Sequence, residues 1–126
     1  MKLRHLFAIN IIFAAFFGLG CSFFPNQMFQ MYGLTPDAGG VWVTRLAGGS
    51  LLGFATLMCF GWKSAPAEAR RAIALALLIQ DVIGLMASME IQLSGAVGAI
   101  GWSSPALYLM LALGYAYFLF IKPRDV

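Results

Sequence analysis

Three ionisable side chains lie inside long apolar stretches of the chain: Arg45, Asp81 and Glu90. Such residues are rare in membrane spans, where they pair with each other, hold a ligand or carry protons. The carboxyl group of Asp81 predicts a proton- or cation-binding site. Its alternative role is structural, as a neutral acid that hydrogen-bonds neighbouring helices. The structural role is favoured because a single acid lies at that depth, whereas a proton relay needs several.

Helix rise sets the depth of each charge. Arg45 and Glu90 lie about 25 and about 28 Å from the basic end of their spans, nearly level with each other. Arg45–Glu90 is therefore the preferred ion pair. Alternatively, Arg45 extends to the outer headgroups, toward Asp37. An Arg45–Asp81 pair would need strong helix tilt.

Asp81 lies deeper, about 15 Å from the basic end and near mid-membrane. A bare carboxylate there is costly, so we expect it to be paired, hydrated or protonated. Asn10 and Tyr115 fall at similar depths. They are the expected hydrogen-bond partners of Asp81.

Other reactive residue types give weaker signals. His5 is the single histidine and lies outside the first span, so one chain cannot build a two-histidine haem site. Cys21 and Cys59 are expected at opposite membrane faces, too far apart for a disulfide. Four methionines could join Cys21 in a soft Cu(I) site, although packing is their favoured role: Met28, Met31, Met86 and Met89. With no catalytic motif present, we expect a non-enzymatic protein without a metal or cofactor.

Four apolar stretches are long enough to position these residues across a membrane, at about 6–24, 38–61, 69–93 and 105–121. Seven of the eight Lys and Arg residues lie in segments on one side of them: Lys2, Arg4, Lys63, Arg70, Arg71, Lys122 and Arg124. This charge bias predicts cytoplasmic N- and C-termini.

Composition agrees with a membrane protein, because 61% of the 126 residues are hydrophobic and only 10% are charged. The four spans use most of the chain, so residues 1–126 are interpreted as a single transmembrane domain with little extramembrane mass. The basic residues cluster at span boundaries, where they contact lipid. Nucleic-acid binding is therefore excluded.

The segment between the first two spans predicts a short interfacial helix over 25–33, with Pro25 at its start and Gly33 at its C-terminal cap. Its apolar residues are expected on the bilayer, and its polar residues in water: Met28, Phe29, Met31 and Tyr32 against Asn26, Gln27 and Gln30. Thr35 is then interpreted as the N-cap of the next helix.

Small and polar residues mark the faces on which membrane helices meet. Each span offers one such stripe: Asn10, Ala14 and Gly18; Arg45, Gly49 and Gly53; Asp81, Gly84, Ser88 and Gln92; Tyr108, Ala112 and Tyr115. These stripes predict an all-α, four-helix membrane bundle with a partly polar seam. Gly49 and Gly53 form a GxxxG pair that could instead pack against another protein.

Three short runs give the chain a family resemblance: Tyr32 to Asp37, Arg45 to Gly48 and Leu52 to Ala55, with Leu111 to Tyr117 extending it. In these the chain resembles small bacterial inner-membrane proteins of the broad DoxX-like group. The resemblance implies a four-span fold in the bacterial inner membrane. It implies no reaction and no catalytic residue.

Two functions fit these observations. The first is an accessory or assembly subunit that packs against a larger membrane complex or self-associates, with lipid as its other partner. The second is a protein that binds or transports a small ligand (an ion, a quinone or a lipid) through Asp81, Arg45 and Glu90. The first is preferred because extramembrane mass is small and the glycine stripes are extensive.

Overall fold

A computed structural model describes residues 2–125 and shows four long helices, α1 (Leu3–Phe23), α3 (Ala38–Lys63), α4 (Ala67–Leu93) and α5 (Ser103–Ala116). A 3-10 turn, η1 (Ala99–Trp102), leads into α5, and a π-helical turn, η2 (Tyr117–Ile121), continues it. The short helix α2 (Pro25–Met31) follows α1, and a final 3-10 turn, η3 (Pro123–Asp125), follows η2. Four helices are long and apolar enough to cross a membrane, so the chain is a multi-pass membrane protein. The predicted all-α four-helix bundle is confirmed.

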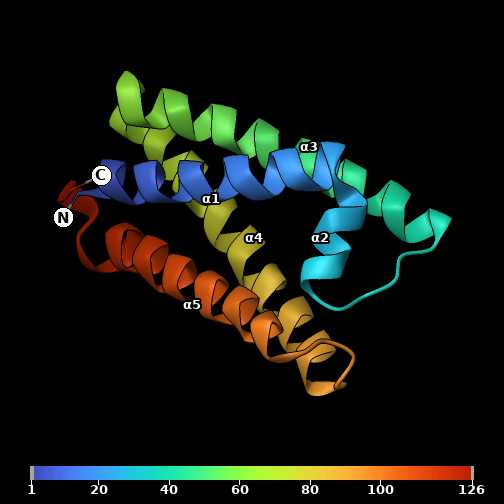
Figure 1. The fold of residues 1–126 in the computed structure, drawn as a ribbon. Helices are drawn as coiled ribbons and strands as arrows, with labels where there is room; N and C mark the ends of the chain where they lie inside the picture. The colour runs from blue at the N-terminus through green and yellow to red at the C-terminus, as the bar shows by residue number, and fades with distance from the viewer. Residues whose placement is uncertain (1, 126) are drawn as a thin grey trace.

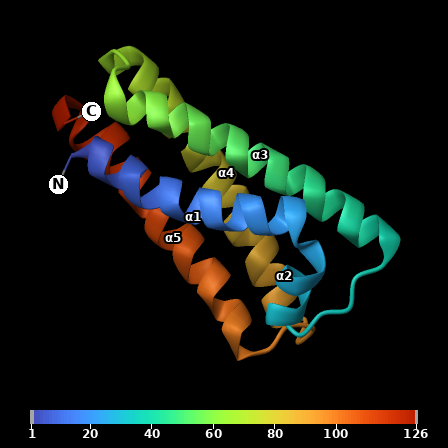
Figure 2. The same cartoon turned by 45° about the horizontal axis from the view of Figure 1, so that its top comes forward.

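The helices form two closely packed pairs, α1 with α3 and α4 with α5. The pairs meet at the end of the bundle that holds both termini and diverge toward α2 (Figures 1 and 2). At the terminal end, the Arg71 guanidinium donates to the Pro123 carbonyl at 2.8 Å and ties α4 to the C-terminal segment. The bundle is therefore closed at one end and open in its other half.

The hydrophobic core occupies the closed half. Its largest fully buried side chains include Phe7 of α1, Met58 of α3, Leu77 of α4 and Tyr115 of α5. These positions lie in the part of each helix nearer the terminal end. The core therefore holds the two helix pairs together at the terminal end of the bundle.

Glycines allow α1 and α3 to approach closely. A Cβ atom on Gly48 would lie 2.6 Å from the Ser22 nitrogen and 2.8 Å from the Gly18 oxygen, so only hydrogen fits there. Gly49 and Gly53 meet nothing within 4 Å and lie on the exposed face. The prediction that their stripe faces the bundle interior was wrong, because the buried face of α3 runs through Gly48, Ala55 and Met58.

Two features at the α2 end also differ from prediction. The N-cap of α3 is Asp37, whose carboxylate accepts a hydrogen bond from the Gly40 nitrogen at 2.6 Å, and not Thr35. Within α2, Met28 is buried. Met28 thus turns toward the other helices rather than out to lipid, whereas Met31 is exposed.

Candidate functional site

A cavity of about 460 Å³ lies between the diverging helix pairs. Each long helix lines it with one stripe of residues, and on α4 the stripe runs from Leu77 to Ile91 at steps of one and three residues. This stripe spans about 20 Å along the helix axis. Some lining residues are also exposed, including Ala47 and Ala87, so the cavity reaches the outer surface of the bundle.

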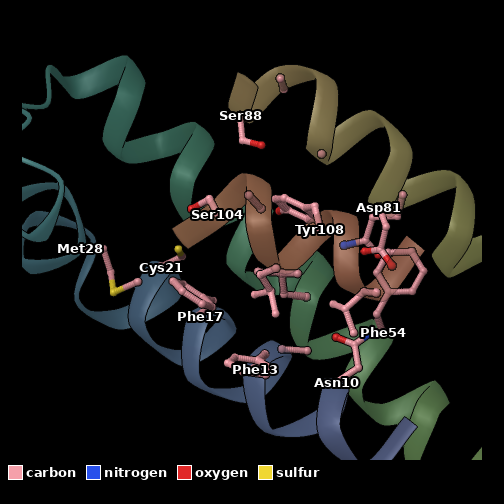
Figure 3. A pocket seen from close by; sticks show the side chains of 18 of the residues that line it. Asn10, Phe13, Phe17, Cys21, Met28, Phe54, Asp81, Ser88, Ser104 and Tyr108 are labelled. Atoms are coloured by element: carbon pink, nitrogen blue, oxygen red, sulfur yellow. The ribbon is translucent and has the colours of Figure 1, made fainter. Parts of the chain in front are cut away.

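Asp81 and Asn10 lie at the end of the cavity next to the hydrophobic core. Met28, Cys21 and Ser104 lie at the opposite end, under α2 (Figure 3). The cavity therefore has a polar base inside the bundle and a mainly apolar body that extends toward α2.

The carboxyl group of Asp81 has no partner in the described part of the chain. The side chain is only 2% exposed, and its Oδ2 atom is buried without a hydrogen bond. On the adjacent residue, Gln80, which lines the same cavity, the Oε1 atom is likewise buried and unpaired. Buried polar atoms are nearly always hydrogen-bonded in proteins. Two unpaired acceptors on adjacent residues that line one cavity therefore indicate a place where a ligand or water completes the site.

Asn10 and Tyr115, the expected partners of Asp81, bond to each other instead. The Asn10 Nδ2 donates to the Tyr115 hydroxyl at 2.8 Å, and that hydroxyl donates to the Met58 sulfur at 3.7 Å. This chain of bonds joins α1, α5 and α3 through the core. Because it uses both groups, the prediction that they satisfy Asp81 was wrong.

The Asn10–Tyr115 bond can be tested by a double-mutant cycle. We expect Tyr115→Phe alone to lower the free energy of unfolding by about 1 kcal/mol, because Asn10 keeps a buried amide without its partner. Adding Asn10→Leu should cost less than the sum of the two single changes. The measurement is SDS-induced unfolding in mixed micelles; additive losses would contradict the bond.

Arg45 and Glu90 do not form the predicted ion pair. Both side chains are exposed, and neither contacts an opposite charge within the described residues. The reason is the divergence of the helix pairs, which separates α3 from α4 at this end of the bundle. Neither residue lines the cavity. An Arg45–Asp81 pair is likewise absent from the described residues.

The other predicted positions are divided between the cavity and the outer surface. Gly84 lies against the ring of Tyr108, which a Cβ atom would approach to 2.5 Å, and Ser88 lines the cavity. Gly49 and Gly53 lie outside it. On α4 the predicted stripe therefore follows the cavity wall from Asp81 to Ser88 but not at Gln92, whereas on α3 the stripe lies outside the cavity.

Helix α2 covers the open end of the cavity. Its Met28 and Phe29 line the cavity, and so does Tyr32, which follows it. The Tyr32 hydroxyl and the Ser104 hydroxyl are hydrogen-bonded at 3.0 Å. This bond joins the segment after α1 to the start of α5, and so bridges the two helix pairs.

Most aromatic residues of the cavity wall were missed by sequence reasoning, which placed Tyr108 alone among them on an interior face. Six aromatic side chains line the cavity: Phe13, Phe17, Phe29, Tyr32, Phe54 and Tyr108. In an apolar span these residues look like lipid contacts. The signal that could have identified Phe13 and Phe17 is their spacing from Asn10, which places them on one helix face.

No protein-family model, curated protein or solved structure matches this chain. The resemblance to the DoxX-like group therefore stays a prediction, and the functional argument depends on the geometry of the site.

Proposed function

We propose that this protein binds a small, largely apolar ligand in the cavity between its four helices. The observation that carries the proposal is the unpaired carboxyl group of Asp81 at the base of a cavity of about 460 Å³. Ligand sites typically enclose about 300–1,000 Å³ and combine apolar walls with a few polar groups. The cavity has this composition.

The position of the cavity supports a ligand that arrives from the membrane. Its wall contains exposed residues of α3 and α4, so its surface continues into the apolar outer face of the bundle. A molecule dissolved in lipid reaches Asp81 without crossing water. A ligand of this kind agrees with the quinone and lipid alternatives from the sequence, and Arg45 and Glu90 take no part in holding it.

Orientation and location complete the proposal. The seven basic residues at the terminal end support cytoplasmic termini, and with them an α2 and a cavity opening that face the outer side. The resemblance in sequence supports the bacterial inner membrane. Association with a larger membrane protein is a second proposal, supported by the outward-facing pair Gly49 and Gly53.

Cavity blocking tests the first proposal. Ala87→Phe places a ring at the cavity wall, and Ala76→Phe places the same ring on the exposed face of α4 away from the cavity. We expect native mass spectrometry of protein in nanodiscs to show a co-purified small molecule with wild type and Ala76→Phe. Ala87→Phe should lose it by about tenfold or more. Equal occupancy in all three proteins would contradict a ligand in this cavity.

A further inference from the structure

We infer that the ligand of this cavity is a lipophilic amine that carries a positive charge and binds through its ammonium group to Asp81. The inference rests on the proposed function and assigns the chemical class of the ligand. It starts from the charges that line the cavity. Among the described residues that line the wall, Asp81 is the single charged one, and none is Lys, Arg or His.

A cavity wall with one acidic side chain and no cationic one does not fit an anionic head group. A carboxylate or phosphate at the base of the cavity would find no cationic side chain, and it would lie against the carboxyl group of Asp81. Two like charges buried together repel strongly in a medium of low dielectric constant. Fatty acids and phospholipid phosphates therefore do not fit this site.

The unpaired atoms favour a donor with a positive charge. Asp81 Oδ2 and Gln80 Oε1 are both acceptors that are buried without a donor, and both residues line the cavity. An ammonium group has three N–H donors and supplies the positive counter-charge that an ionised carboxyl group needs. A buried carboxylate is costly without such a counter-charge. A hydroxyl group donates one hydrogen bond only and leaves the negative charge of an ionised Asp81 without a counter-charge.

The rest of the cavity fits the apolar part of such an amine. Phe54 lines the cavity as Asp81 does, and an aromatic face attracts a cation. Phe13, Phe17 and Tyr108 line the walls beyond it. The cation thus sits at the base, and the apolar body extends toward α2.

Three matched probes test the assignment: 4-phenylbutylamine, 4-phenylbutanol and 4-phenylbutyrate, which share one apolar body and differ in head group. Titration calorimetry on the full chain in nanodiscs of phosphatidylcholine, with empty nanodiscs subtracted, gives the affinity of each. We expect the amine to bind about 10- to 100-fold more tightly than the alcohol, the range for a hydrogen bond to a charged group. The carboxylate should not bind.

Variants of Asp81 locate the effect. Asp81→Asn should abolish the preference for the amine while circular dichroism and gel filtration stay unchanged, and Asp81→Glu should retain it. Glu90→Gln is the matched control, because it neutralises an exposed acid on the same helix outside the cavity. It should leave all three affinities unchanged.

Failure of the amine assignment and failure of the proposed ligand binding give different results. Equal affinity for amine and alcohol, lost for both in Ala87→Phe, would overturn the amine assignment and leave the proposed function standing. Affinities that do not respond to Ala87→Phe would overturn both, because the probes would then bind outside the cavity.

Discussion

Gly48→Leu is expected to lower the free energy of unfolding by about 3 kcal/mol or more, the upper range for overpacking a buried site. The Cβ atom alone would lie 2.5 Å from the Ser22 hydroxyl and 2.6 Å from the Ser22 nitrogen. One of these contacts is with backbone, which cannot move aside as a flexible side chain can. The contact between α1 and α3 must therefore open to accept any side chain at this position.

The next residue provides the matched control. Gly49→Leu puts the same side chain on the same helix, one position along, where a Cβ atom meets nothing within 4 Å. We expect this variant to unfold with nearly wild-type free energy, because leucine there contacts lipid. SDS titration in mixed micelles measures both. Equal losses would show that glycine matters through helix flexibility and not through the close approach.

This pair of glycines shows which features of the fold can be predicted from the sequence and which cannot. Long apolar stretches and the charge bias predicted four spans and a bundle, because length and hydropathy set the number of crossings. The packed face of α3 was assigned one position away from the true one. Gly48 and Gly49 are adjacent glycines, so composition alone cannot say which of them faces α1. In the structure it is Gly48 that packs against the Ser22 backbone of α1.

The candidate site was predictable in part for a similar reason. Asp81 stood out because an acid is rare in a span, and its depth followed from helix rise. Its neighbours depended on the angle between the helix pairs. That angle separates α3 from α4 at the level of Arg45 and Glu90, and it opens a cavity at Asp81. No local pattern encodes this angle, which follows from how the large side chains of the closed half pack.

Leucine substitutions at two buried polar residues, Asp81 and Asn10, are expected to change the free energy of unfolding in opposite directions. Asp81→Leu should raise the free energy of unfolding of the ligand-free protein by about 1–2 kcal/mol, because it removes a buried acceptor without a donor and adds apolar contacts. Asn10→Leu should lower it by about 1 kcal/mol, because it breaks the 2.8 Å bond to Tyr115.

Both residues are buried at the base of the same cavity, so burial and depth do not explain the difference in sign. The difference lies in the hydrogen-bond partner, which Asn10 has and Asp81 lacks. A group that costs stability in the empty protein is expected at a binding site, where the ligand supplies the missing donor. Unfolding titrations of both variants in amine-free micelles check this. A loss of stability in Asp81→Leu would mean that the carboxyl group is already satisfied within the folded chain, and the case for a ligand at Asp81 would lose its main support.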